Sequence, residues 1–174
     1  MSSTFILRII RLFVILSFQV LVFNHIHLFG YITPLVIGYM MVCFHQGTSR
    51  MELLLWGFTT GLLFDIFSNT AGMASAACTL VAMTQPKLLS MFTPRDASDT
   101  IIPTFKTLGF WNYILYTTLL MSILHGTFYL LDAFTLVDWQ LTLLSIIGGT
   151  IAATIIIFFI ELLVRPRMTP PHNL

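Results

Sequence analysis

One carboxylate, Asp65, lies inside an otherwise apolar segment, 56–73, which reads WGFTTGLLFDIFSNTAGM. A charged side chain is costly inside a membrane and usually marks a function. His125 lies inside a second apolar segment, 110–131. An aspartate and a histidine from separate helices can supply acid–base chemistry to a membrane-embedded hydrolase or acyl transferase. An enzyme that uses Asp65 and His125 is therefore one hypothesis.

Three polar side chains reach a similar depth along their predicted helices. At about 1.5 Å per residue from the inner helix ends, Asp65 and His125 both lie roughly 20 Å up, and Gln19 reaches a comparable height. A cluster of Asp65, His125 and Gln19 in the outer half of the membrane is one prediction. The alternatives are that Asp65 extends to the outer headgroups, or that residues 68–70 satisfy its carboxylate locally.

The sequence indicates no other catalytic, metal-binding or nucleic-acid-binding site. It has no zinc-binding spacing, nucleophile elbow, phosphate loop or pair of catalytic aspartates, so we expect a protein that is not an enzyme. His25 and His27 have no convincing third metal ligand, and we expect neither a metal nor a cofactor. The net charge of +1 and the lack of a basic patch argue against nucleic acid as a partner.

The composition is that of an integral membrane protein. Hydrophobic residues make up 57% of the chain, charged residues 9%, and the mean hydropathy is +0.91. The 174 residues leave room for about six spans of roughly 20 residues and for no separate soluble domain. We predict an all-α bundle of six transmembrane helices forming one domain, 1–174. The predicted spans are 5–23, 26–44, 53–67, 72–91, 110–131 and 139–164.

The third predicted span, 53–67, is short for a hydrocarbon core of about 30 Å. It either crosses the membrane among neighbouring helices or forms part of a re-entrant hairpin, which would leave four full spans.

The basic residues predict how the chain is oriented. The outer loops 24–25, 68–71 and 132–138 contain no Lys or Arg, whereas every Lys and Arg falls at the opposite ends of the spans. Cytoplasmic loops of membrane proteins carry an excess of Lys and Arg, so loops without these residues are expected on the opposite side of the membrane. Both termini are therefore predicted to be cytoplasmic.

Small residues recur at intervals of four in the apolar segments. Gly57 and Gly61 lie in the third span, and Gly72 and Ala76 in the fourth. A third stripe includes Gly149 in the last span. Such stripes let helix backbones approach closely, either inside the bundle or against a partner helix.

Two further features concern the inner ends of the spans. In the loop 93–109, Arg95 carries a charge opposite to those of Asp96 and Asp99, and this loop is either a contact surface or a plain connector. Glu161 is predicted to pair with Arg165, one helical turn further on, or with Lys87, which lies at the same depth in the fourth span.

Three segments resemble the rod shape-determining protein MreD family. They are GLLFDIFSNTAG at 61–72, YITPLVIGYMM at 31–41 and FTPRDASDTIIPTFKTLGF at 92–110. The resemblance extends over essentially the whole chain. It implies a subunit of the cell-wall elongation machinery in the bacterial inner membrane, which maintains rod shape as a scaffold. The implied partners are MreC, the actin-like MreB and wall-synthesising enzymes.

The family is also similar in architecture to the substrate-binding subunits of energy-coupling vitamin transporters, which are six-helix bundles. Such a subunit is the alternative function. Those subunits share a small-residue motif on their first span, whereas 12–23 here reads LFVILSFQVLVF, with Ser17 as its only small residue. This departure favours the scaffold, for which we expect no small-molecule ligand.

Overall fold

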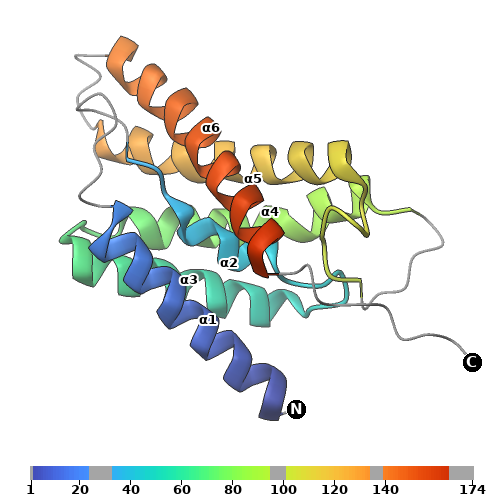
Figure 1. Cartoon of the computed structure of the whole chain (residues 1–174). Coiled ribbons are helices and arrows are strands. Elements are labelled where there is room, and N and C mark those ends of the chain that lie inside the picture. Colours follow the sequence, from blue (N-terminus) through green and yellow to red (C-terminus); the bar gives the residue numbers. More distant parts are fainter. Residues whose placement is uncertain (1, 24–32, 95–100, 134–138, 165–174) are drawn as a thin grey trace, which may run out of the picture.

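The computed structural model describes residues 2–23, 33–94, 101–133 and 139–164 (Figure 1). The regular secondary structure in these ranges is helical. Its elements are α1 (Ser2–Leu21), the 3-10 helix η2 (Val36–Gly38), α2 (Tyr39–Val42), α3 (Arg50–Ser68), α4 (Met73–Phe92), α5 (Phe110–Asp132) and α6 (Trp139–Val164). Three of these helices, α3, α5 and α6, are long and apolar enough to cross a membrane. The protein is therefore a helical membrane protein.

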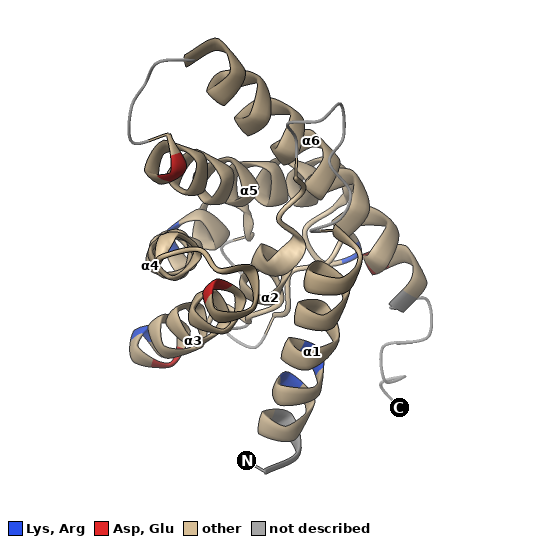
Figure 2. Ribbon diagram, turned by 90° about the vertical axis from the view of Figure 1, so that its left-hand side faces the viewer, with Lys and Arg blue, Asp and Glu red and all other residues tan. Residues whose placement is uncertain are grey.

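The five long helices surround residues 33–44, which we call the central segment. Along the chain, α3 packs against α4, α4 against α5 and α5 against α6, and α1 packs against α3. Between them, η2 and α2 contact all five of these helices. In Figure 2, α2 lies among the surrounding helices.

The long helices begin and end close to the predicted positions. The helix α6 covers the predicted span 139–164, and α5 exceeds its predicted span by one residue. The third span is also longer than predicted, because α3 is a continuous helix of 19 residues. At about 1.5 Å per residue it reaches roughly 28 Å, close to the thickness of a hydrocarbon core.

The prediction of one helix over 26–44 is wrong for its described part, 33–44. Residues 33–35 are extended, and only η2 and α2 are helical, with α2 four residues long. Pro34 lacks an N–H and disfavours the helical conformation of Thr33, which explains the extended start. Residues 34–44 are all buried, so protein surrounds this irregular backbone.

Amphipathic patterning explains how α1 joins the bundle. Leu12, Leu16 and Gln19 are buried and lie on one face at helical spacing. Phe13 and Phe18 on other faces are more than half exposed. In a membrane protein, exposed apolar side chains of this kind face lipid rather than water.

Consecutive elements run in opposite directions, with the central segment as one of them (Figure 1). Arg8 and Arg50 lie near the starts of α1 and α3, Lys87 near the end of α4, and Lys106 in the loop before α5. These helix ends lie together at one end of the bundle. Arg11, the fifth basic residue of the described ranges, lies near the middle of α1. Four of these five basic residues therefore lie toward one end of the bundle.

Candidate functional site

The extended start of the central segment is held by side chains of α1 and α5. Gln19 of α1 donates from Nε2 to the Pro34 carbonyl at 3.0 Å and accepts from the Val36 N–H at 2.7 Å. His125 of α5 accepts from the Leu35 N–H through Nε2 at 3.1 Å. Backbone outside a helix must find partners inside a membrane protein, and these two side chains supply them.

Tyr129, one turn beyond His125 on α5, completes this set of contacts. Its hydroxyl accepts from the Thr33 N–H at 3.0 Å and donates to the Thr33 carbonyl at 3.2 Å. The His125 and Tyr129 rings stack, with centroids 6.2 Å apart. Side chains therefore bind the N–H groups of Thr33, Leu35 and Val36, while Pro34 has none to bind.

The hydrogen bonds of His125 define which of its nitrogens carries the proton. Because Nε2 accepts from the Leu35 N–H, the proton of the neutral ring belongs on Nδ1. There it is donated to the Met121 carbonyl at 2.9 Å. A second proton on Nε2 would face the Leu35 N–H, so this geometry requires a neutral imidazole.

Gly149 of α6 makes room for that imidazole. A Cβ atom at Gly149 would lie 2.5 Å from His125 Cδ2 and 2.9 Å from Nε2. The glycine in the last predicted small-residue stripe therefore serves packing inside the bundle, where α6 closes over the His125 ring.

Polar side chains of α4 and α6 bind the other half of the central segment. Gln85 is fully buried and donates from Nε2 to the Phe44 carbonyl at 3.3 Å and to the Tyr116 hydroxyl oxygen at 3.0 Å. The Tyr39 hydroxyl donates to Glu161 Oε2 at 2.9 Å. Buried polar groups from α1, α4, α5 and α6 thus all converge on 33–44.

Asp65 is not part of this cluster. Its Oδ1 accepts from the Thr70 hydroxyl at 2.5 Å and from the Ala74 N–H at 3.0 Å. Its Oδ2 accepts from the Ser75 N–H at 2.8 Å and from the Ser75 hydroxyl. The carboxylate therefore binds the free N–H groups at the start of α4, where the helix dipole also favours a negative charge.

The turn between α3 and α4 explains why Asp65 takes this role. Asn69 ends α3 in the left-handed conformation, with φ 54°, and Gly72 precedes α4 with φ 80°. Gly72 tolerates that conformation, but as the N-cap residue it has no side chain to bind the first N–H groups. Asp65 supplies the missing cap from the preceding helix.

Gly57 and Gly61 allow α3 to approach α4 closely. A Cβ at Gly61 would lie 2.4 Å from the Ala74 carbonyl oxygen and 2.5 Å from Ser75 Cα. A Cβ at Gly57 would lie 2.8 Å from the Cys78 carbonyl oxygen. Both glycines face backbone of α4, so this stripe acts within the chain. Gly61 also brings the start of α4 within reach of Asp65.

The prediction that Asp65 joins His125 and Gln19 is wrong, and the other two residues meet only through the backbone that both bind. Gln19 and His125 both bind 34–36, whereas Asp65 binds the start of α4. Thr70 among its partners confirms the local alternative in part. Sequence reasoning missed Gln85 and the inward role of Tyr129. A glutamine inside an apolar helix was the available signal for Gln85.

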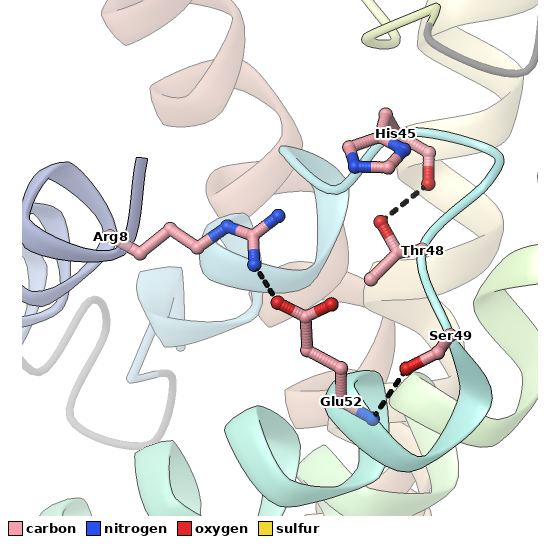
Figure 3. A network of polar contacts seen from close by, with 5 residues as sticks. All are labelled: Arg8, His45, Thr48, Ser49 and Glu52. Carbon is pink, nitrogen blue, oxygen red and sulfur yellow. Dashed lines mark hydrogen bonds and ion pairs between the residues drawn. The ribbon is translucent and has the colours of Figure 1, made fainter. Parts of the chain in front are cut away.

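An ion pair links α1 to the start of α3 at the basic end (Figure 3). Arg8 of α1 donates to a Glu52 carboxylate oxygen. Ser49 begins α3 by accepting from the Glu52 N–H at 3.3 Å. The Thr48 hydroxyl donates to the His45 carbonyl at 2.8 Å and closes the turn before the helix.

Several predictions concern residues outside the described ranges. Arg95, Asp96 and Asp99 lie there, as do His25 and His27. So does Arg165, the predicted partner of Glu161.

Lys87, the other predicted partner of Glu161, makes no ion pair with it in the described part of the chain. Within the described ranges, no three His, Cys, Asp or Glu side chains gather as metal ligands.

Comparison with protein-family models, with curated proteins and with solved structures finds no match for this chain.

Proposed function

We propose that the chain is a non-catalytic membrane scaffold of the cell-wall elongation machinery in the bacterial inner membrane, and that it binds the membrane-spanning helix of MreC. The proposal rests on the motif resemblance and on the way those motif residues act. Asp65 and Gly61 join α3 to α4, and residues 33–41 form most of the central segment. A residue bound in this way serves to position helices, which is what a scaffold needs.

The observation that carries the proposal is a shallow groove between α3 and α4, on the side that faces away from the rest of the bundle. It has a volume of about 620 Å³ and is open to the surroundings. Its floor includes Gly72, Ala76 and Thr79 of α4, and Phe58 and Leu62 of α3 stand beside them. Small side chains let a partner helix approach the backbone closely, so this face suits a single membrane-spanning helix.

Co-purification with MreC tests this proposal through Ala76, which is exposed in the groove. We expect Ala76→Leu to weaken MreC recovery about tenfold, equivalent to about 1.4 kcal/mol, because the added side chain fills the groove. The matched control is Gly126→Leu on α5, where an added Cβ meets open space. Equal recovery of MreC with both variants would remove the groove from the interface.

A vitamin-binding subunit remains the second candidate, because interrupted helices often build transporter binding sites. The central segment is such an interruption. Here, however, side chains already bind the N–H groups of Thr33, Leu35 and Val36. A ligand would have to displace them, so we favour the scaffold. A vitamin that raises the melting temperature of the purified protein by several degrees would reverse this preference.

We further propose six membrane passes, with the central segment as the second and with both termini in the cytoplasm. The alternating direction of successive elements supports this arrangement. The position of four of the five described Lys and Arg residues toward one end of the bundle also supports it.

A further inference from the structure

A second groove lies between α3 and α4 at the basic end of the bundle and meets the groove around Ala76 at Met83, which lines both. It has a volume of about 590 Å³. Its lining includes Arg50 and Leu54 of α3, and Met83, Pro86, Lys87 and Ser90 of α4. In Figure 2, α3 and α4 lie side by side and each carries basic residues, drawn in blue.

The two cations of this groove have no acidic neighbour in it. Arg50 and Lys87 are both exposed, and neither forms an ion pair in the described part of the chain. The nearby acidic residue of α3, Glu52, lines a different groove, between α1 and α3, and binds Arg8 there. The positive charge between α3 and α4 is therefore not balanced by the described carboxylates.

The apolar part of the groove lies deeper along the same two helices. Leu54 is one turn inside Arg50, and Met83 is one turn inside Lys87. Met83 is 70% exposed, and Leu54 and Pro86 add further apolar lining. Moving from the helix ends toward their middles, the groove thus changes from cationic to apolar.

We propose that this groove binds an anionic phospholipid. Arg50 and Lys87 hold the headgroup phosphate, and one acyl chain lies along Leu54 and Met83. Guanidinium and ammonium groups are the usual phosphate ligands of proteins, and basic pockets between membrane helices take acidic lipids. The start of α3 adds the positive end of its helix dipole. The apolar floor favours a lipid over a free phosphate.

Native mass spectrometry of the full chain tests the proposal, with phosphatidylglycerol and phosphatidylcholine offered at equal concentrations. We expect phosphatidylglycerol to be retained preferentially. The double variant Arg50→Gln, Lys87→Gln should reduce its retention about thirtyfold, as expected for the loss of two cations near a lipid surface. The control variant Arg11→Gln, Lys106→Gln removes two cations that do not line the groove, and should retain the preference.

A second variant tests the same site in case the double variant does not fold. Ser90→Glu keeps both cations and places a carboxylate at an exposed position beside Lys87. It should also lower phosphatidylglycerol retention while leaving the melting temperature unchanged. Equal retention of the two lipids, or an unchanged preference in a folded groove variant, would overturn the proposal. Full displacement of the lipid by millimolar inorganic phosphate would show that only the phosphate is bound, and would contradict the proposed contact of the acyl chain with Leu54 and Met83.

Discussion

Asp65 acts at the residue scale as a helix cap supplied by a neighbouring helix. Its two carboxylate oxygens accept from Thr70, Ala74 and Ser75, and the side chain is only 6% exposed. A carboxylate buried in an apolar segment is commonly a functional site in membrane proteins. Here its cost is offset by charge-assisted hydrogen bonds and by the start of α4.

Replacing Asp65 with asparagine should therefore destabilise the fold. One of the two acceptor oxygens becomes an amide donor, which faces donors at the start of α4. We expect a loss of about 2 kcal/mol of unfolding free energy, the size of a lost cap with a charged acceptor. Asp132→Asn at the exposed end of α5 is the control and should change the unfolding free energy by less than about 0.5 kcal/mol. Unfolding in mixed micelles measures both, and equal effects would contradict the capping role.

The long helices could be predicted from the sequence at the scale of elements, whereas the central segment could not. Apolar runs of sufficient length predict α3, α5 and α6. A backbone surrounded by lipid has no water to bind, so its N–H and C=O groups must form hydrogen bonds within the helix. The run 26–44 is equally apolar, but its described part is surrounded by protein. Gln19 and His125, far away in the sequence, bind its backbone and remove the need for a helix.

The sequence also could not predict which helix each glycine packs against. An interval of four shows which residues share a helix face but not what that face contacts. Gly57 and Gly61 face α4, and Gly149 faces His125. Ala76, in the other stripe, remains exposed. Only the three-dimensional arrangement separates the stripes used within the chain from the one available to a partner.

The orientation of the whole molecule can be tested at two loops at opposite ends. Lys106 and Ala71 are both exposed, and the natural Cys43 and Cys78 are buried. In intact cells, an impermeant thiol reagent should label Ala71→Cys and leave Lys106→Cys unlabelled, because the proposed orientation places the basic end in the cytoplasm. Permeabilised cells, in which both variants should react, provide the control. Labelling of Lys106→Cys in intact cells would reverse the proposed orientation.

The whole molecule is organised around the central segment, to which buried polar groups of the surrounding helices bind. If this is their role, residues that bind the same backbone stretch must be energetically coupled. Gln19 and His125 both hold 34–36, although they belong to α1 and α5. Asp65 binds a different part of the chain.

A double-mutant cycle of unfolding free energies tests this claim most directly. Gln19→Leu and His125→Leu should be coupled by about 1 kcal/mol, because either change frees the segment that the other side chain holds. The parallel cycle of Asp65→Asn with His125→Leu should be additive within about 0.5 kcal/mol. Additive effects of Gln19 and His125, or strong coupling of Asp65 to His125, would contradict the account.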